Sequence, residues 1–312
     1  IFENDERPGH LLIIGGGPIG LELAQAHLRL GSQVTVLEGL KALGKDDPEL
    51  SEIALRHLRA EGIVIREGAM VQRIEQDVEG TIHATISVDG AEETVRGTHL
   101  LVATGRAPNI ADLGLEEAGV KFNKGGVEVN KGLRTSNRKI YAIGDVTGGY
   151  QFTHIAGYHA GLVIRSALFR LPVSADPSIY PWCTYTDPEL AHVGLTEDDA
   201  RKKHGKVSVL RWPYHENDRA QAEGETEGLV KVVVGRNGKV LGASICGAHA
   251  GEIIQMWSLA ISSGMKIKPF TSFISPYPTL TEINRRAAIT YYAPKLANPM
   301  VRRVVEFLRK FG

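Results

Sequence analysis

The stretch LLIIGGGPIGLELAQAHLRLG, residues 11–31, constrains the fold of this chain more than any other. A short apolar run, typical of a buried strand, leads into glycines, and apolar residues at helical spacing follow until Gly31. Gly15, Gly17 and Gly20 form the pattern G-x-G-x-x-G between them. The first glycine allows a tight turn, the second lets backbone approach a pyrophosphate, and the third lets helix and strand pack closely. The stretch therefore predicts a dinucleotide site at a helix N-terminus, with a plain glycine-rich connector as the alternative.

The following residues extend this unit into a doubly wound sheet. Strands are expected at residues 33–38 and 63–68, with a helix at 47–62 that opens on Asp-Pro. This alternation of strands and helices predicts a parallel sheet. From residue 70 to 102 the rhythm changes to short alternating runs, which predict an antiparallel meander whose last run covers residues 93–103.

The second half of the chain reads as further units. A strand is expected at residues 139–145 and a helix at 156–169, followed by a proline-containing linker at 172–181. Beyond the linker, a run of strands precedes helices, which indicates a separate α+β unit. The fold class predicted for the whole chain is α/β.

Glu38 marks the expected coenzyme preference. It ends the strand at 33–38, about 20 residues after the glycine motif, where a carboxylate accepts hydrogen bonds from ribose hydroxyls and repels a 2′-phosphate. NAD is therefore favoured over NADP. Lys41 leaves the alternative open, because a lysine on that loop tolerates the extra phosphate; a solvated surface lysine is its plainer interpretation.

Composition narrows the class of partner. The 36 basic and 36 acidic residues give a net charge of +0 and are well mixed, so neither a nucleic-acid partner nor a membrane partner is expected. No apolar stretch approaches the roughly 20 residues of a membrane span. The two cysteines, Cys183 and Cys246, form no C-x-x-C pattern, which suits the cytoplasm. The charged opening IFENDERPGH reads as a connector, which predicts that the chain is a fragment.

A family resemblance rests on motifs spread along the chain. GGGPIGLELA, ATGRAPN, IYAIGD, YTDPELAHVGLTE and YPTLTEINRRAA occur in the order seen in the flavoprotein pyridine nucleotide-disulfide oxidoreductases. The chain looks most like the branch of dihydrolipoamide dehydrogenase and mercuric reductase. The resemblance implies a Rossmann-like NAD-binding domain at residues 1–105, the second part of an FAD domain at 106–172, and an interface domain at 173–312 that forms a homodimer.

The resemblance also implies an activity and a set of site residues. The activity is that of an FAD-dependent, NAD(P)H-linked oxidoreductase, in which hydride passes from nicotinamide to flavin and electrons leave to a disulfide, metal ion or similar acceptor. Glu22 matches a glutamate beside nicotinamide and flavin, and Asp145 an aspartate on the FAD ribitol, although an aspartate there also suits a turn cap. The implied cofactor-binding residues are Gly15, Gly17, Pro18, Ile19, Gly20, Glu22, Glu38, Val71 and Gly105 for NAD, and Asp145, Thr153 and His154 for FAD. No metal site is expected.

The sequence departs from the family at two points. It contains neither the family's first FAD glycine turn nor the redox-active cysteine pair, so the chain as given is expected to be inactive alone. Tyr277 stands where the family carries an acid/base histidine, while Glu282 keeps the place of the glutamate that orients it. A phenol titrates near 10, so at neutral pH it donates a hydrogen bond but is a poor base. Tyr277 and Glu282 are the candidate catalytic residues, with a packing role as the alternative for Tyr277.

A second class of function stays open on the sequence alone. Without the first flavin motif and the cysteine pair, the chain also suits a non-catalytic NAD-binding and dimerisation module.

Overall fold

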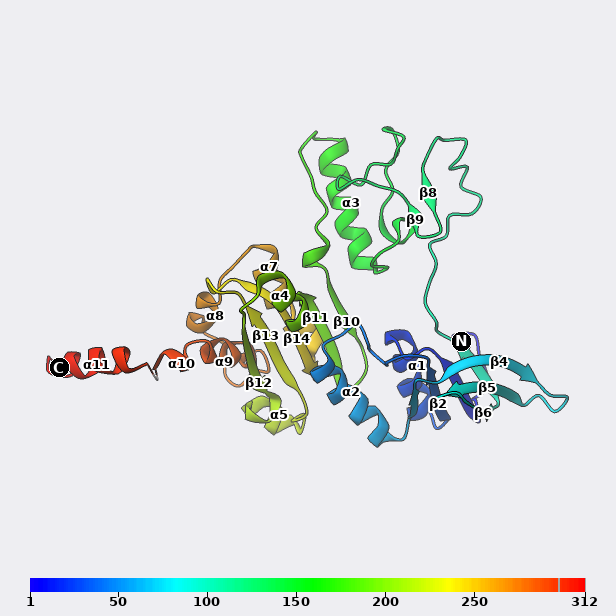
Figure 1. Cartoon of the computed structure of the whole chain (residues 1–312), viewed down its shortest axis with the longest axis horizontal. Helices are drawn as coiled ribbons and strands as arrows, with labels where there is room; N and C mark the ends of the chain where they lie inside the picture. The colour runs from blue at the N-terminus through cyan, green and yellow to red at the C-terminus, as the bar shows by residue number, and fades with distance from the viewer. Residues whose placement is uncertain (297, 312) are drawn as a thin grey trace. The chain divides into compact units, whose positions relative to one another are not determined.

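The computed structural model describes residues 1–296 and 298–311 and divides into two compact units. Unit 1 joins residues 1–104 to residues 181–312, and unit 2 comprises residues 105–180. Figure 1 labels most of their helices and strands. The stretches expected to form the nucleotide-binding and interface domains thus belong to one unit. The finer division at residues 105 and 172 stays a prediction.

Unit 1 begins with the parallel sheet that the sequence predicts. Its strand order is β3-β2-β1-β7, and all neighbours run parallel. The strands are β1 (His10–Ile14), β2 (Gln33–Glu38), β3 (Val64–Glu67) and β7 (His99–Val102). The helices α1 (Pro18–Arg29) and α2 (Pro48–Glu61) connect the first three. Both open with proline in the first turn, where the missing N–H costs nothing.

The antiparallel meander is also confirmed, with one correction. Strands β4 (Met70–Gln76), β5 (Ile82–Val88) and β6 (Ala91–Gly97) form a three-stranded antiparallel sheet. The run expected at 93–103 is not one strand, because the chain leaves β6 at Gly97 and enters the parallel sheet as β7. A Cβ on Gly97 would lie 2.5 Å from Leu12 Cγ, so glycine allows this close crossing over β1.

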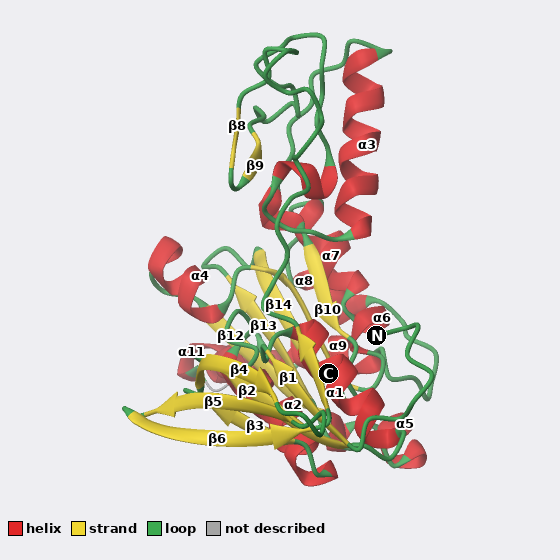
Figure 2. Cartoon of the chain, turned by 90° about the vertical axis from the view of Figure 1, so that its right-hand side faces the viewer, coloured by secondary structure: helices red, strands yellow, loops and turns green. Residues whose placement is uncertain are grey.

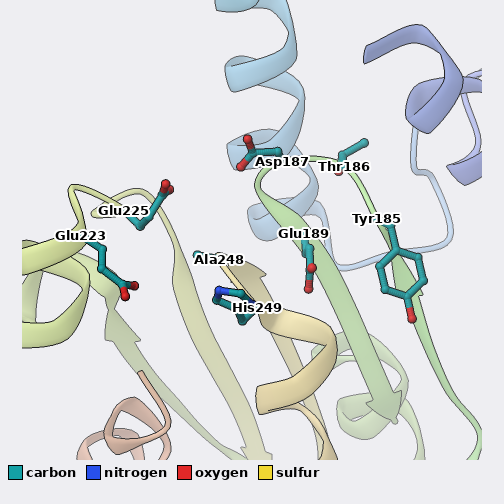
Figure 3. Close-up of a pocket in the computed structure, with 8 residues that line it drawn as sticks. All are labelled: Tyr185, Thr186, Asp187, Glu189, Glu223, Glu225, Ala248 and His249. Carbon is teal, nitrogen blue, oxygen red and sulfur yellow. The ribbon is translucent and has the colours of Figure 1, made fainter. Parts of the chain in front are cut away.

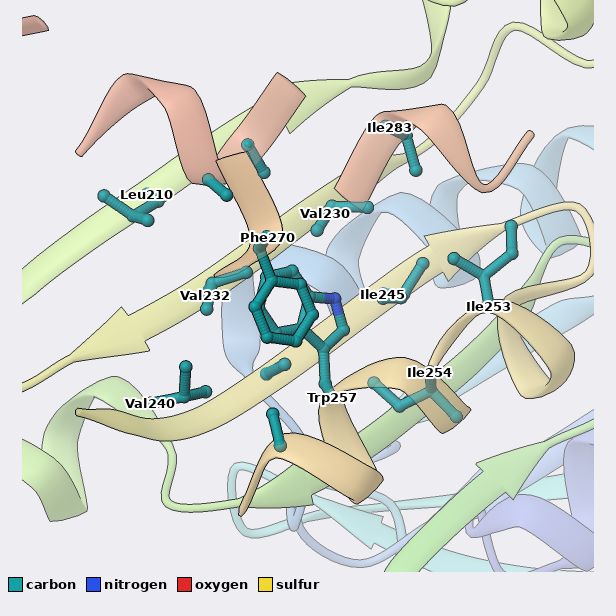
Figure 4. Close-up of a cluster of buried hydrophobic side chains, with 14 of the residues drawn as sticks. Leu210, Val230, Val232, Val240, Ile245, Ile253, Ile254, Trp257, Phe270 and Ile283 are labelled. Atoms are coloured by element: carbon teal, nitrogen blue, oxygen red, sulfur yellow. The ribbon is translucent and has the colours of Figure 1, made fainter. Parts of the chain in front are cut away.

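The remainder of unit 1 is a five-stranded antiparallel sheet covered by helices. Its order is β10-β11-β14-β13-β12. The strands are β10 (Pro181–Thr184), β11 (Glu189–Gly194), β12 (Ser208–Pro213), β13 (Leu229–Val234) and β14 (Val240–Gly247). Helices α6 (Ala250–Ile253), α7 (Gln255–Ser262), α8 (Lys268–Ser272) and α9 (Glu282–Thr290) close a core in which the rings of Trp257 and Phe270 stack at 4.3 Å (Figure 4).

The expected order of strands first and helices afterwards is wrong in detail. Helix α4 (Glu197–His204) separates β11 from β12, and α5 (Asp218–Glu223), after the 3-10 turn Tyr214–Glu216, separates β12 from β13. Each buries only one alanine, so neither carries an apolar period that a sequence pattern can detect. Helices α10 (Ala293–Leu296) and α11 (Pro299–Leu308) follow α9.

Unit 2 contains one long helix and little sheet (Figure 2). Helix α3 (Thr153–Ala167) confirms the predicted helix, and β8 (Phe122–Asn123) and β9 (Gly126–Val127) form a short hairpin. The strand predicted at 139–145 is wrong: an isolated bridge between Arg134 and Tyr141 precedes the 3-10 turn Gly144–Thr147. The apolar run is real, but among the described residues no strand pairs along it. A second 3-10 turn, Pro177–Ile179, ends the unit.

A buried lysine joins helix α2 to the five-stranded antiparallel sheet. Along β13, Val230 and Val232 face the helix-covered core, so Lys231 points to the opposite face. Its side chain is 5% exposed, and its Nζ lies 2.8 Å from Asp47 Oδ2, 3.0 Å from Glu49 Oε2 and 3.0 Å from Glu197 Oε2. Asp47 is the N-cap of α2 and accepts a hydrogen bond from Glu49 N. The start of α2 is therefore fixed to the antiparallel sheet by ion pairs.

Replacement of this lysine should destabilise unit 1. Lys231→Met removes the cation but leaves the buried Asp47 carboxylate, and losing one partner of a buried pair costs about 3 kcal/mol. Urea unfolding followed by circular dichroism measures the change. Arg73→Gln is the control, because the Arg73–Glu75 pair is well exposed and should contribute almost nothing. Equal stability of the two variants would contradict the assignment.

Candidate functional site

The glycine turn between β1 and α1 has three different steric environments. Gly15 has φ +111°, and a Cβ there would lie 2.5 Å from Ala103 O. A Cβ on Gly20 would lie 2.0 Å from Gly15 O, so α1 contacts the turn directly. Gly17 is the N-cap of α1, and a Cβ there would meet no atom within 4 Å. Two glycines thus serve packing, whereas Gly17 borders open space.

The start of α1 suits an anion. No side chain caps it, and its first turn carries no acidic residue. Pro18 occupies the first position, and Ile19 is 44% exposed. The first amides of a helix lack partners within it and sit at the positive end of its dipole. With open space at Gly17, these amides fit a pyrophosphate, and the residues present fit NAD.

Glu38 lies at the rim of the same turn. Its Oε2 accepts a hydrogen bond from Gly16 N at 2.7 Å, and its Oε1 accepts one from Leu40 N at 2.8 Å. Main-chain amides therefore hold the carboxylate at the end of β2, and each oxygen keeps a lone pair for a ribose hydroxyl. Lys41 is well exposed, with its Nζ 3.9 Å from Glu67 Oε1.

The loop after Glu38 is fixed from the antiparallel sheet. Trp182 Nε1 donates to Asp46 Oδ1 at 2.7 Å, and the next residue, Asp47, pairs with Lys231. Sequence reasoning missed all four residues. One sequence feature could have revealed this contact: Lys231 is the only charged residue of LVKVVVG, a strand otherwise built of apolar residues. A lysine buried in such a strand needs a carboxylate partner.

Polar residues on one face of α1 bind a loop of the antiparallel sheet. Glu22 Oε1 accepts a hydrogen bond from Tyr185 N at 2.8 Å. The Gln25 amide donates to Asp187 O at 2.7 Å and accepts from Asp187 N at 2.8 Å, and Arg29 pairs with the Asp187 carboxylate at 2.7 Å. Burial raises the pKa of Glu22, and the hydrogen bond from Tyr185 opposes that rise. The position of Glu22 thus depends on the loop that starts at Tyr185.

The other residues expected near NAD are placed as follows. Val71 lies half-buried on β4, where the pairing register with β5 shifts between Val71 and Arg73. Gly105 is the first residue of unit 2, has φ +121° and would carry a Cβ into open space. Both are compatible with the expected contacts, which stay predictions.

The residues expected near FAD gather within unit 2. Asp145 is exposed on the 3-10 turn Gly144–Thr147, and Thr153 and His154 are exposed in the first turn of α3. Gly144 lets the turn pack on α3, since its Cβ would lie 2.8 Å from Ala156 Cβ. The first turn of α3 carries no acidic side chain. A carboxylate for ribitol and amides for a flavin ring therefore fit FAD.

Tyr277 and Glu282 are not hydrogen-bonded to each other. Tyr277 is 72% exposed, and its hydroxyl donates to Asp218 Oδ2 at 2.9 Å. Glu282 instead pairs with Arg286 at 3.2 Å. The hydrogen bond to Asp218 and the negative charge of that group raise the pKa of Tyr277, which makes the phenol a still poorer base. Asp218 is a further candidate residue that sequence reasoning missed.

Neither cysteine has the properties of a redox centre. Cys183 and Cys246 are both free thiols. Burial raises the pKa of Cys183, and raises that of Cys246 to about 12, so both stay protonated and unreactive. Within residues 1–296 and 298–311, no cluster of histidine, cysteine and acidic side chains suits a metal ion.

A hollow of about 480 Å³ lies beside the loop that starts at Tyr185 (Figure 3). It is lined by Tyr185, Thr186, Asp187, Glu189, Glu223, Glu225, Ala248 and His249. Glu223 and Glu225 lie on one side and Tyr185 on the other. So many carboxylates disfavour a nucleotide phosphate, so the hollow is no candidate for the coenzyme site.

Comparison with known proteins identifies the family and a dimerisation domain. Residues 1–160 match the family of pyridine nucleotide-disulphide oxidoreductases, and residues 180–288 match the dimerisation domain of the same family. The chain belongs to the pyridine nucleotide-disulphide oxidoreductase family, as its motifs predict. The α/β fold class is confirmed as well.

Individual relatives agree with this assignment. The chain is 38% identical over 294 residues to a mercuric reductase of Lysinibacillus sphaericus, covering 93% of this chain and 54% of the relative. It is 37% identical over 286 residues to a dihydrolipoyl dehydrogenase of Staphylococcus aureus, covering 91% and 61%. The HOCl-induced flavoprotein disulfide reductase RclA of Escherichia coli aligns with a TM-score of 0.83 and 31% identity, over 92% of this chain and 66% of RclA. The chain thus spans about half to two thirds of these relatives.

Alanine substitutions should separate the two roles of the glycines. Gly17→Ala should cost less than about 1 kcal/mol of stability, because the new methyl meets no atom, yet weaken NADH binding at least about tenfold by filling the phosphate space. Gly20→Ala should cost about 3 kcal/mol or more, because its methyl overlaps Gly15 O. Calorimetric titration and urea unfolding measure both. Unchanged NADH affinity in Gly17→Ala would exclude the pyrophosphate position.

Asp46 should give a pH-dependent stability difference. Burial raises the pKa of Asp46 to about 6 from an ordinary 3.8, despite the hydrogen bond from Trp182. The folded chain therefore binds this proton more tightly than the unfolded chain, so stability is full below about pH 4 and falls as the pH rises through about 6. Asp46→Asn stays neutral and keeps an oxygen acceptor for Trp182. The free energy of unfolding of Asp46→Asn should exceed that of the natural chain by about 3 kcal/mol above that range and match it below. Urea unfolding measures the stability of both proteins across this pH range. A stability difference that does not change with pH would refute the assignment.

Proposed function

We propose that this chain is the nucleotide-binding and dimerisation part of an FAD-dependent, NAD(P)H-linked oxidoreductase. The observation that carries the proposal is the glycine turn, in which open space at Gly17 adjoins an uncapped helix start and the held carboxylate of Glu38. Family membership supports it, and one aligned structure is that of a flavoprotein disulfide reductase. The family's dimerisation domain supports a homodimer.

The residues of the chain divide the work of binding. Helix α1 amides hold the pyrophosphate, Glu38 holds the adenosine ribose, and Glu22, positioned by Tyr185, stands beside the nicotinamide. In unit 2, Asp145 holds ribitol hydroxyls, and the first amides of α3 stabilise negative charge on the flavin ring. FAD, held by these residues, would supply the redox chemistry, which is hydride transfer from nicotinamide and electron transfer to a disulfide, a metal ion or a similar acceptor.

The same proposal covers the compartment. Two free, protonated thiols suit a reducing environment such as the cytoplasm. A module without catalytic function would need the NAD residues and the dimer interface only. That alternative leaves the exposed Asp145 and the uncapped start of α3 without a function. The oxidoreductase is therefore the better supported hypothesis.

Coenzyme preference tests the role of Glu38. Glu38→Ala should weaken NADH binding about tenfold and NADPH binding less, because the carboxylate accepts from ribose hydroxyls but repels a 2′-phosphate. Glu67→Ala is the matched control: Glu67 accepts a hydrogen bond from Ala42 N at 3.0 Å in the same loop, but its other oxygen faces Arg59. Calorimetric titration with both coenzymes measures the ratio. A natural chain that prefers NADPH would contradict this reading.

The Tyr277 variant tests the electron-transfer proposal in the full-length natural protein. NADH should bleach the flavin at the same rate in the natural protein and in Tyr277→Phe, whereas turnover with a disulfide or Hg²⁺ should fall about tenfold or more, because the phenol donates to the acceptor side. Stopped-flow absorbance separates the two steps. Asp218→Asn should move the alkaline limb of the pH profile to lower pH, since it removes the charge that raises the pKa of Tyr277. No flavin reduction by NADH would refute the proposed function, and full turnover in Tyr277→Phe would leave Tyr277 a structural role only.

A further inference from the structure

Helix α11 (Pro299–Leu308) leaves its apolar side chains uncovered. No residue of this helix is buried, and every one except Val301 is exposed. The exposed apolar side chains here and just beyond are Met300 at 74%, Val304 at 52%, Val305 at 50%, Phe307 at 58%, Leu308 at 57% and Phe311 at 74%. A helix in a globular protein normally turns such residues toward a core. Within the described part of the chain, nothing buries them.

The apolar and charged residues lie on separate faces of this helix. At 3.6 residues per turn, the apolar residues fill one uninterrupted arc of about 160°. Its members are Met300, Val301, Val304, Val305, Phe307, Leu308 and Phe311. The rings of Phe307 and Phe311 lie 5.1 Å apart on this side. The remaining arc carries Arg302, Arg303 and Glu306, and Arg309 and Lys310 follow directly after the helix on the same side of the apolar arc.

The charged face is strongly basic. Four cations and one acid give it a net charge of 4 − 1 = +3, in a chain whose net charge is +0. The surface that covers this helix must therefore be apolar where it meets Phe307 and anionic where it meets the arginines. A second copy of α11 would bring like charges together, and an isolated helix of this length is marginal in water. An anionic lipid surface meets both conditions.

We propose that α11 binds in the plane of an anionic lipid surface, with its apolar arc at the acyl boundary and its cations among the headgroups. A helix of this length extends about 15 Å, half the thickness of the hydrocarbon core, so it lies on the membrane. Among the described residues, no helix has the length and apolarity to cross a bilayer. The expectation of no membrane partner used the charge of the whole chain, which conceals this local excess. The inference does not depend on the proposed enzymatic activity.

Vesicle flotation tests the inference on the chain as it stands. The protein should float with vesicles of phosphatidylcholine and phosphatidylglycerol, less with phosphatidylcholine alone, and added salt should weaken the binding. Phe307→Ser with Leu308→Ser should reduce partitioning at least about tenfold on both vesicles, because each removes a large apolar group. Arg302→Gln with Arg303→Gln should reduce it about thirtyfold on the anionic vesicles only.

A matched control isolates the helix from general exposure. Val78→Ser changes a fully exposed valine between β4 and β5 and should leave flotation unchanged. The proposal would be overturned if the natural chain did not float, or if the double variant Phe307→Ser with Leu308→Ser floated as well as the natural chain. If sedimentation instead shows that this double variant dissociates an oligomer while no vesicle binds, the face is covered by a second copy and the lipid proposal is wrong.

Discussion

The ion pairs of Lys231 are the interaction on which the nucleotide site depends. A lysine almost closed to solvent holds three carboxylates, one of which caps α2. Arg211 pairs with two of the same carboxylates, Glu49 and Glu197, at 2.8 and 3.3 Å. Because a buried charge without partners is strongly unfavourable, these groups hold one arrangement. The parallel sheet and the five-stranded antiparallel sheet therefore belong to one compact unit, although they match two separate family models.

The positions of the residues around the glycine turn depend on these contacts between the two sheets. The turn's own glycines set the close approach of α1 to β1, but the carboxylate at its rim, that of Glu38 at the end of β2, is followed by a loop whose far end is held by Trp182 and Lys231. Glu22 is held in the same way, by the main chain at Tyr185. In the proposed function, the antiparallel sheet therefore positions Glu22 at the nicotinamide end of the coenzyme and holds the far end of the loop that follows Glu38 at the adenosine end.

The sequence was informative where a periodic pattern or a special residue decides local structure. Strand β2 occupies the expected residues 33–38, and Gly15, Gly17 and Gly20 lie between a strand and a helix as expected. Prediction failed where the structure depends on pairing between strands that are distant in the sequence. Residues 139–145 have the composition of a strand but no neighbouring strand, and the single apolar run at 93–103 divides between two sheets. The hydrogen-bond partners of Tyr277 and Asp46 could not be predicted either, because Asp218 and Trp182 are distant from them in the sequence.

Residues of the five-stranded antiparallel sheet hold the 39–47 loop of the parallel-sheet region. This has a consequence for protein engineering. Coenzyme preference is commonly altered by transplanting such a loop between homologues. In this chain a transplanted loop would arrive without Asp46 and Asp47. The Trp182 indole would then lose the Asp46 carboxylate, and the Lys231 ammonium would lose one of its three carboxylates. A successful exchange therefore has to carry the matching residues of β10 and β13 with it, so that the loop and the strands of the dimerisation domain that hold it change together.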